Sequence, residues 1–334
     1  MSSTSMTLPL DLYRQPGCPP VVAADPGDDA PGWAGAHHEA VRSLVAEHGS
    51  VVVRGLGLRD ADTVAAVFRR LGTPLMAEKE AFAPRETYSE GVYSATKWPP
   101  HQQMCMHHEL SYTSPVPGLM MFACLGAPAS GGATPVADAG KVLDALPGPL
   151  VDRFQREGWL LTRNYNEDIG ASYADAFGTS DRAEVERYCR ANDIEVSWQP
   201  DGGLRTRQRR QAVVTHPVTG RRCWFNQVAF LSGWTLDPDV REYLVDLYGA
   251  DGLPFDTAYG NGDPIGEDVV MLLNEVYEAH TLRQDWQRGD LMLVDNIACA
   301  HGREPFEGDR EVLVAMAEPV DQAPWSSDGN GGTS

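Results

Sequence analysis

Two histidines and one glutamate carry most of the chemical information in this sequence. His107 and Glu109 lie two positions apart in the segment Met-His-His-Glu-Leu (106–110), and His301 lies far along the chain. If residues 106–110 form a β-strand, His107 and Glu109 point to one face and His108 to the other, because strand side chains alternate. Two imidazoles and one carboxylate on one face of a metal are typical of non-haem Fe(II) oxygenases. We therefore predict a metal site of His107, Glu109 and His301, and a packing role for His108.

The composition narrows the class of protein. The 334 residues carry a net charge of −20, which argues against nucleic-acid binding because that function needs a basic surface. No signal peptide and no apolar run of about 18 residues is evident, so we expect no membrane span. The six cysteines form no CxxC pair, which suits reduced thiols. We expect a soluble, cytoplasmic protein.

The pattern of apolar residues predicts early helices and many short strands later in the chain. Helices are expected at residues 34–48, 60–71, after Asp138, 181–192 and 267–280. Strands are expected at residues 51–54, 119–124, 134–137, 159–165, 194–198, 212–216, 222–226, 290–294 and 311–316, with His301 and Arg310 in a loop between the last two. This order favours an antiparallel β-sandwich or jelly roll with helices outside it over a parallel βα sheet.

One domain is expected over most of the chain. Residues 1–30 are rich in Pro, Gly and Asp and predict an extended arm. Residues 31–322 contain no internal repeat and no second apolar block, so we predict a single jelly-roll domain there. Residues 323–334 predict a flexible tail.

Several short motifs occur in the same order as in one enzyme family. They are His-His-Glu (107–109), Gly-Gly-Ala-Thr (131–134), Arg-Asn-Tyr (163–165), Trp-Phe-Asn-Gln (224–227), Tyr-Gly-Asn-Gly-Asp-Pro-Ile (259–265) and a set from Gly289 through His-Gly-Arg-Glu-Pro-Phe (301–306) to Arg310. With these motifs the chain resembles the TauD/TfdA family of Fe(II)/2-oxoglutarate-dependent dioxygenases from about residue 51 to 319. Within it the chain looks closest to the syringomycin-type aspartate β-hydroxylases, with clavaminate synthase more distant.

The resemblance implies a fold, a cofactor and a co-substrate site. The implied fold is α+β with a mainly β core, a double-stranded β-helix (jelly roll) flanked by helices. The implied cofactor is Fe(II), with 2-oxoglutarate and O2 as co-substrates. Thr134 and Arg310 match the positions that bind the far carboxylate of 2-oxoglutarate, a task that suits the bidentate guanidinium. Arg303 is the rival anchor, and Ala133 replaces a Glu that this branch usually carries.

Substrate contacts are expected from two further segments. Asn226 and Gln227 are candidates to line the substrate pocket. Arg207 belongs to a run of arginines at 205–210 that could meet an acidic amino acid or the acidic surface of a carrier protein, although such runs are usually solvated. Cys105 lies close to the expected metal and is a candidate for oxidation.

The function implied by the resemblance is hydroxylation of an unactivated C–H bond of an amino acid, free or carrier-bound, in specialised metabolism. Glu109 occupies the position that a halide would need, which disfavours halogenation. Desaturation or cyclisation by the same oxidative chemistry stays open. The rival hypotheses are a cupin-like metal hydrolase or isomerase that does not use 2-oxoglutarate, and a degenerate jelly roll that only binds.

Overall fold

The centre of the molecule is one large sheet. In the computed structural model, residues 10–83, 85–166, 170–200 and 202–322 are described. Eight strands form the sheet, in the order β1 (Asp11–Tyr13), β2 (Val21–Ala23), β3 (Ser50–Arg54), β17 (Leu291–Asp295), β7 (Val116–Gly126), β20 (Glu311–Val320), β5 (Val92–Ser94) and β4 (Thr87–Ser89). Only β2 and β3 pair in parallel among the strands of the described residues, so the sheet is essentially antiparallel.

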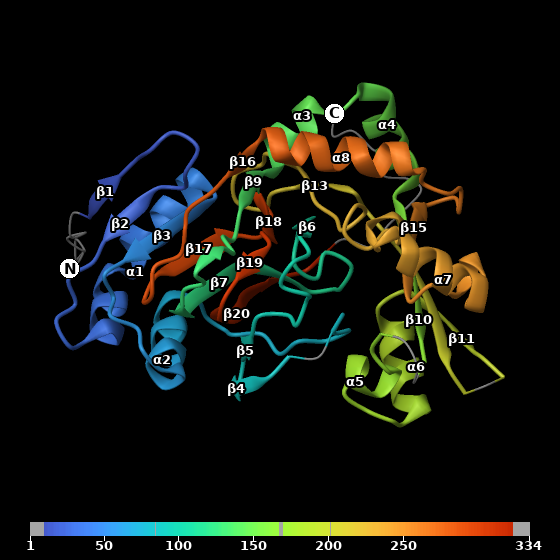
Figure 1. Cartoon of the computed structure of the whole chain (residues 1–334), viewed down its shortest axis with the longest axis horizontal. Coiled ribbons are helices and arrows are strands. Elements are labelled where there is room, and N and C mark those ends of the chain that lie inside the picture. Colours follow the sequence, from blue (N-terminus) through green and yellow to red (C-terminus); the bar gives the residue numbers. More distant parts are fainter. Residues whose placement is uncertain (1–9, 84, 167–169, 201, 323–334) are drawn as a thin grey trace, which may run out of the picture.

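Both faces of this sheet are buried, and the strand alternation divides them between two cores. On β7, Met121 and Ala123 face a core formed with α1 (Ala30–His48) and α2 (Ala61–Leu71), whereas Met120 and Phe122 face the opposite way. β17 and β20 alternate in the same manner. Figure 1 shows α1 and α2 beside the N-terminal strands of the large sheet. A sheet covered on both faces needs apolar residues at nearly every position of its central strands, as the sequence of β7 has.

A smaller sheet faces the inner side of the large one and completes a jelly roll. Its strand order is β16 (Thr281–Leu282), β9 (Val136–Asp138), β18 (Cys299–Arg303) and β6 (Met104–His107). Met104 and Met106 of β6 share one core with Met120 and Phe122 of β7. The predicted α+β fold with a double-stranded β-helix core is therefore confirmed, and the residues of interest lie between its two sheets.

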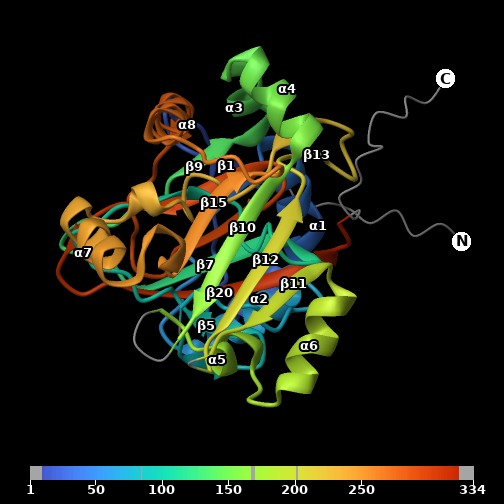
Figure 2. The same cartoon turned by 90° about the vertical axis from the view of Figure 1, so that its right-hand side faces the viewer.

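A third, four-stranded sheet lies beside the jelly roll. Figure 2 shows its strands next to one another, with α6 (Arg182–Ala191) alongside, in the order β11 (Ile194–Trp198), β12 (Leu204–Arg210), β10 (Trp159–Tyr165) and β15 (Phe255–Tyr259). The remaining described elements are α3 (Ala139–Ala145), α4 (Gly148–Glu157), α5 (Tyr173–Phe177), α7 (Pro238–Tyr248), α8 (Glu267–Ala279), the 3-10 turns Gly233–Thr235 and Ala250–Gly252, and the strand pairs β13 (Val213–Thr215) with β14 (Arg222–Trp224) and β8 (Ser130–Gly131) with β19 (Phe306–Glu307).

Two sequence expectations about the elements need correction. His301 was expected in a loop but lies in β18, whose neighbours β6 and β9 hold both of its edges. The first long helix begins at Ala30 rather than residue 34, because the Asp29 side chain accepts a hydrogen bond from the Gly32 amide and caps it.

The predicted domain boundaries stay a prediction. Within the expected arm, residues 11–13 and 21–23 are extended but join the large sheet as β1 and β2. The tail expected at residues 323–334 lies outside the described residues. None of the helices that the structure describes is long and apolar enough to cross a membrane.

Candidate metal and co-substrate site

The register of two neighbouring strands brings the two histidines together. His107 ends β6, His301 lies in the middle of β18, and their Cα atoms are direct antiparallel partners. Residues in such a pair project to the same face of a sheet. The ring centroids are 4.5 Å apart, and both side chains point between the two sheets. Two imidazoles far apart in sequence therefore share one small volume.

Glu109 reaches the same volume from the turn that follows β6, not from the strand itself. Its Oε2 lies 3.8 Å from Nε2 of His107 and 3.4 Å from Nε2 of His301. The fully buried Asn296 fixes the backbone at this point: its Oδ1 accepts from the Glu109 amide at 2.8 Å, and its Nδ2 donates to the Glu109 carbonyl at 3.0 Å. Glu109 therefore lies next to the two histidines, as expected. It reaches them from a turn that Asn296 holds in place, and not through the alternation of side chains along a strand.

These three side chains fit a metal ion. Their ligand atoms lie within 4.8 Å of one another, and all three residues are buried. Nδ1 of His107 hydrogen-bonds to the Cys105 carbonyl at 2.8 Å, which orients the ring so that Nε2 faces inward. Burial, followed by repulsion from His107, lowers the pKa of His301 to about 4, so its imidazole is neutral and able to bind a metal at neutral pH.

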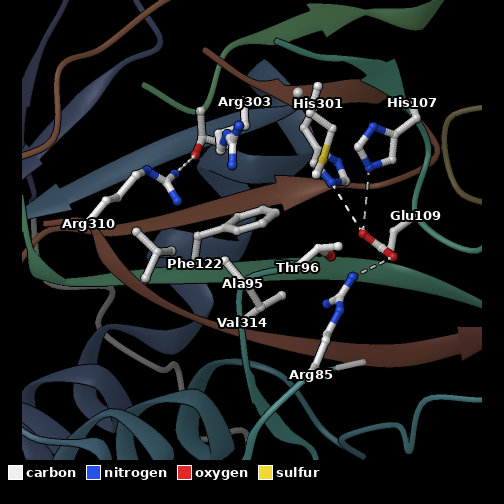
Figure 3. A pocket seen from close by; sticks show the side chains of 14 residues that line it. Arg85, Ala95, Thr96, His107, Glu109, Phe122, His301, Arg303, Arg310 and Val314 are labelled. Carbon is white, nitrogen blue, oxygen red and sulfur yellow. Dashed lines mark hydrogen bonds and ion pairs between the residues drawn. The ribbon is translucent and has the colours of Figure 1, made fainter. Parts of the chain in front are cut away.

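A buried arginine lies on the other side of Glu109. Nη2 of Arg85 is 3.1 Å from Oε1 of Glu109, and its Nε is 3.3 Å from Oε1 of Glu78 (Figure 3). Burial by itself would raise the pKa of Glu109. The Arg85 charge and the two neighbouring imidazoles outweigh burial and hold that pKa well below its usual range. Glu109 is thus an anion in the folded protein.

A second positive group closes the far end of the same cavity. Nε of Arg310 donates to the Gly132 carbonyl at 2.9 Å, and its Nη2 donates to Oγ1 of Thr134 at 3.1 Å. Nε1 of Trp286 also donates to that hydroxyl oxygen, at 3.2 Å. Among the described residues no carboxylate pairs with Arg310, and burial, with Arg303 nearby, lowers its pKa to about 10. The arginine is still charged at neutral pH and faces the cavity without an anion.

Apolar side chains separate the two ends of this cavity. Phe122, Val312 and Val314 line its wall, and Figure 3 shows the triad at one end with Arg303 and Arg310 at the other. Such walls exclude water, so charges at both ends act in a low-dielectric space. The arrangement suits a ligand with a metal-binding group at one end and a carboxylate at the other.

Comparison with known proteins agrees with this geometry. The profile described as "Taurine catabolism dioxygenase TauD, TfdA family" matches residues 14–316, which is most of the chain. The chain belongs to the TauD/TfdA family. Dapdiamide synthesis protein DdaC of Enterobacter agglomerans is 33% identical over 283 residues, covering 85% of this chain and 86% of that protein. A clavaminate synthase-like protein of Arabidopsis thaliana is 28% identical over 288 residues, covering 83% of each.

A solved structure shows the same fold. PvcB from Pseudomonas aeruginosa superposes with a TM-score of 0.53 at 14% identity, covering 96% of this chain and 95% of that one. Family membership makes this TauD/TfdA protein a dioxygenase that uses Fe(II), 2-oxoglutarate and O2. The hydrolase, isomerase and pure binding hypotheses are thereby disfavoured.

Arg303, the rival anchor for 2-oxoglutarate, is held by backbone instead. Its guanidinium donates to the carbonyls of Trp98, Pro99 and Gln102 at 2.9, 2.6 and 2.7 Å. Three of its five N–H donors make these bonds, which hold the segment at 98–102 in place. Arg303 also lines the cavity in this TauD/TfdA enzyme and its Nε has no hydrogen-bond partner in the described part of the chain, so its part in binding 2-oxoglutarate stays a prediction.

His108 lies on the opposite side of its segment from the metal ligands. Its Nδ1 is 2.6 Å from the Asn296 carbonyl, and its ring packs against Phe225 at a centroid distance of 4.8 Å. It is fully buried and outside the group of possible metal ligands. This placement agrees with the packing role predicted for it.

The expected substrate residues are not at the cavity. Asn226 donates to the Ala212 carbonyl and accepts from the Val228 amide, while Gln227 donates to the His108 carbonyl at 2.7 Å. Both are buried: Gln227 holds the backbone at His108, and Asn226 joins the backbone at Ala212 to that at Val228. Arg207 is exposed on the outward face of β12. No contact among the described residues supports a substrate role for these three, and that role stays a prediction.

The structure also bears on two other expectations, the arginine run at residues 205–210 as a substrate contact and Cys105 as a target of oxidation. Side chains of the run alternate between the two faces of β12, so Thr206 and Gln208 face inward. Nε of Arg205 donates to the Asn164 side chain at 2.8 Å.

Burial raises the pKa of Cys105 to about 11, so its thiol is protonated at neutral pH. The protonated thiol is a weaker target for oxidation than a thiolate.

Sequence reasoning missed several residues of the site. Arg85 and Glu78 come from a segment without regular structure and without any of the family motifs. Trp286 likewise follows α8 outside the motifs. Phe230, whose ring stacks on His107 at a centroid distance of 4.5 Å, lies three residues after a motif and carries only the apolar signal that any core aromatic would give.

Acid should destabilise the metal-free protein through His108. Burial lowers the pKa of its imidazole to about 3, whereas a histidine in an unfolded chain titrates near about 6.5. Above about pH 6.5 the ring is neutral in both states. At pH 5 the unfolded chain has gained a proton that the folded chain has not, which lowers the free energy of unfolding by about 2 kcal/mol.

Urea denaturation at pH 7.5 and 5.0 measures this loss. His108→Asn should lose about 2 kcal/mol less than the wild type over that interval. An equal loss in both proteins would show that His108 is not the responsible group.

Proposed function

We propose that the protein hydroxylates an unactivated C–H bond of an amino acid, free or tethered to a carrier protein, in the biosynthesis of a specialised metabolite. The observation that carries the reaction class is the cavity with apolar walls between the triad and Arg310, which has no carboxylate partner among the described residues. The relative named for dapdiamide synthesis supports a role in specialised metabolism. The six cysteines, all in the described part of the chain, are free, which supports a reducing cytoplasm as the compartment.

The proposed ligands are Nε2 of His107, Nε2 of His301 and Oε2 of Glu109. Bound iron would supply the oxidising chemistry that activates O2 and the C–H bond. The protein's part is to hold these three atoms on one side of the ion, to leave the other side facing the cavity, and to exclude water with Phe122 and its apolar neighbours.

The proposed anchor for 2-oxoglutarate is Arg310 with Thr134. The guanidinium offers a fork to the far carboxylate, and the Thr134 hydroxyl can donate its proton to the same group, since its oxygen already accepts from Arg310 and Trp286. The keto acid end would then point along the cavity toward the triad. In this orientation a single ligand would pair with Arg310 at one end of the cavity and with the metal at the other.

Replacing a metal ligand should abolish turnover. His107→Ala and His301→Ala should bind Fe(II) at least about tenfold more weakly and form no succinate, because metal sites lose affinity steeply even when supporting groups are removed. His108→Ala is the matched control and should keep iron binding. Equilibrium dialysis and succinate release measure both properties, and an active His107→Ala beside an inactive His108→Ala would overturn the ligand assignment.

Arg310→Ala should weaken 2-oxoglutarate binding without affecting iron. A buried carboxylate loses a charge-assisted pair worth about 2–5 kcal/mol, which corresponds to roughly thirtyfold or more in affinity. Calorimetric titration of the Fe(II)-loaded, anaerobic protein gives the affinity. Arg303→Ala, which removes a neighbouring charge held by backbone carbonyls, should have a smaller effect, and the reverse order would make Arg303 the anchor.

The substrate class can be found by coupled turnover. Succinate formation in air should be stimulated by one amino acid from a panel, or by its thioester on a carrier protein, and mass spectrometry should show a gain of one oxygen atom. Loss of two hydrogens would indicate desaturation or cyclisation instead. A panel that leaves succinate formation at its background rate in both forms would contradict an amino acid substrate.

A further inference from the structure

We infer that Arg85 is a positioning residue that limits Glu109 to a single metal-binding oxygen. The inference rests on the proposed function, because it assumes that Glu109 is a ligand of iron. By holding Oε1, Arg85 leaves only Oε2 for the metal and keeps the cavity side of the ion free for 2-oxoglutarate and O2.

The two oxygens of Glu109 have different partners. Oε1 is 3.1 Å from Nη2 of Arg85, whereas Oε2 faces Nε2 of His301 at 3.4 Å and Nε2 of His107 at 3.8 Å. Figure 3 shows Arg85 approaching the carboxylate from the side away from the histidines. A carboxylate free of such a partner could turn both oxygens to a metal and occupy a position that the co-substrate needs.

Arg85 is itself held in place. Its side chain is 7% exposed, and its Nε lies 3.3 Å from Oε1 of Glu78, whose backbone amide donates to the Tyr93 hydroxyl at 3.1 Å. A second carboxylate therefore lies at ion-pair distance from the guanidinium, although Nε of Arg85 makes no hydrogen bond with the described residues. The ion pairs with Glu78 and Glu109 orient Arg85 before any ligand binds.

The segment that carries Arg85 is anchored to the third sheet through Glu80. Glu80 is fully buried with φ of +54°. Its carbonyl accepts from Arg163 of β10 at 2.7 Å and from the Tyr112 hydroxyl at 3.0 Å. Its carboxylate accepts from Gln208 of β12 at 2.9 Å and from the Tyr188 hydroxyl at 2.9 Å.

These contacts give the third sheet a part in the metal site. The inward face of β12, in the middle of the arginine run, holds Glu80, and the chain continues from there to Arg85. A segment without helix or strand would otherwise place a long side chain poorly, because each free rotamer lowers the fraction of time spent in one geometry. The anchoring makes the Arg85–Glu109 contact a built feature of the fold.

The test separates iron binding from 2-oxoglutarate binding in anaerobic protein. For Arg85→Met we expect Fe(II) affinity equal to or tighter than that of the wild type, because the ion gains a carboxylate oxygen. We expect 2-oxoglutarate to bind at least tenfold more weakly to the iron-loaded variant. Arg85→Lys, which keeps a charged donor for Oε1, should recover part of that loss.

A crystal structure of the Mn(II)-loaded variant decides whether orientation is the cause. The wild type should show one Glu109 oxygen on the metal and the other on Arg85, and Arg85→Met should show both oxygens on the metal. A single bound oxygen in the variant would overturn the inference, even with weak 2-oxoglutarate binding, since the loss would then come from the missing charge alone. Parallel loss of both affinities, or no change in either, would also overturn it.

Further measurements separate a failure of this inference from misfolding of the variant and from a failure of the proposed function. Arg54→Met removes a partly buried ion pair, with Asp290 at 2.8 Å, whose residues do not line the cavity, and should change neither affinity. If Arg85→Met does not fold, Glu78→Gln is the substitute: it should weaken 2-oxoglutarate binding at least threefold at unchanged iron affinity, and no change would overturn the inference. If wild-type protein binds iron but no 2-oxoglutarate, the proposed function itself fails.

Discussion

The structure depends on one buried carboxylate and on the three side chains that surround it. Glu109 lies between Arg85 on one side and the imidazoles of His107 and His301 on the other. Burying a carboxylate is costly unless it is paired and hydrogen-bonded. The pairing in turn requires the register of β6 with β18, the Asn296 clamp on the Glu109 backbone, and the anchored segment before Arg85. Elements from the three larger sheets therefore converge on a single side chain.

The cavity beside Glu109 is built for a ligand with two charged ends. At one end His301 is neutral and the Cys105 carbonyl orients His107, and at the other Arg310 is buried without a carboxylate among the described residues. A buried cation without an anion lowers the stability of a folded protein. Its presence is explained if an anionic ligand binds there during function, as 2-oxoglutarate does in the TauD/TfdA family.

The sequence could predict those strands and site residues that are marked by a short stretch of the chain. Parts of the strands β7, β17 and β20 were expected because each contains a short, continuous apolar run that is visible in the sequence. His107, Glu109, His301, Thr134 and Arg310 were found through motifs, and the structure gathers them around one cavity. His301 was misplaced in a loop because Cys-Ala-His-Gly-Arg has little intrinsic strand preference, and pairing with β6 and β9 overrides it.

Features that arise from long-range folding could not be predicted in this way. Arg85 follows a segment that Gln208, Tyr188 and Arg163 anchor through Glu80, and none of these contacts leaves a local pattern. Asn226 and Gln227 have the chemistry of pocket residues, yet their hydrogen bonds are to the backbone. Polar side chains that hold the main chain and those that hold a ligand look the same in sequence.

The most direct test of the account is an anaerobic absorption spectrum of the wild-type protein with Fe(II) and 2-oxoglutarate. If iron is held by His107, Glu109 and His301 with an open side toward Arg310, the keto acid can chelate it and a weak visible charge-transfer band should develop as 2-oxoglutarate is added. Protein with iron demonstrably bound that shows no such band at saturating 2-oxoglutarate would contradict the account.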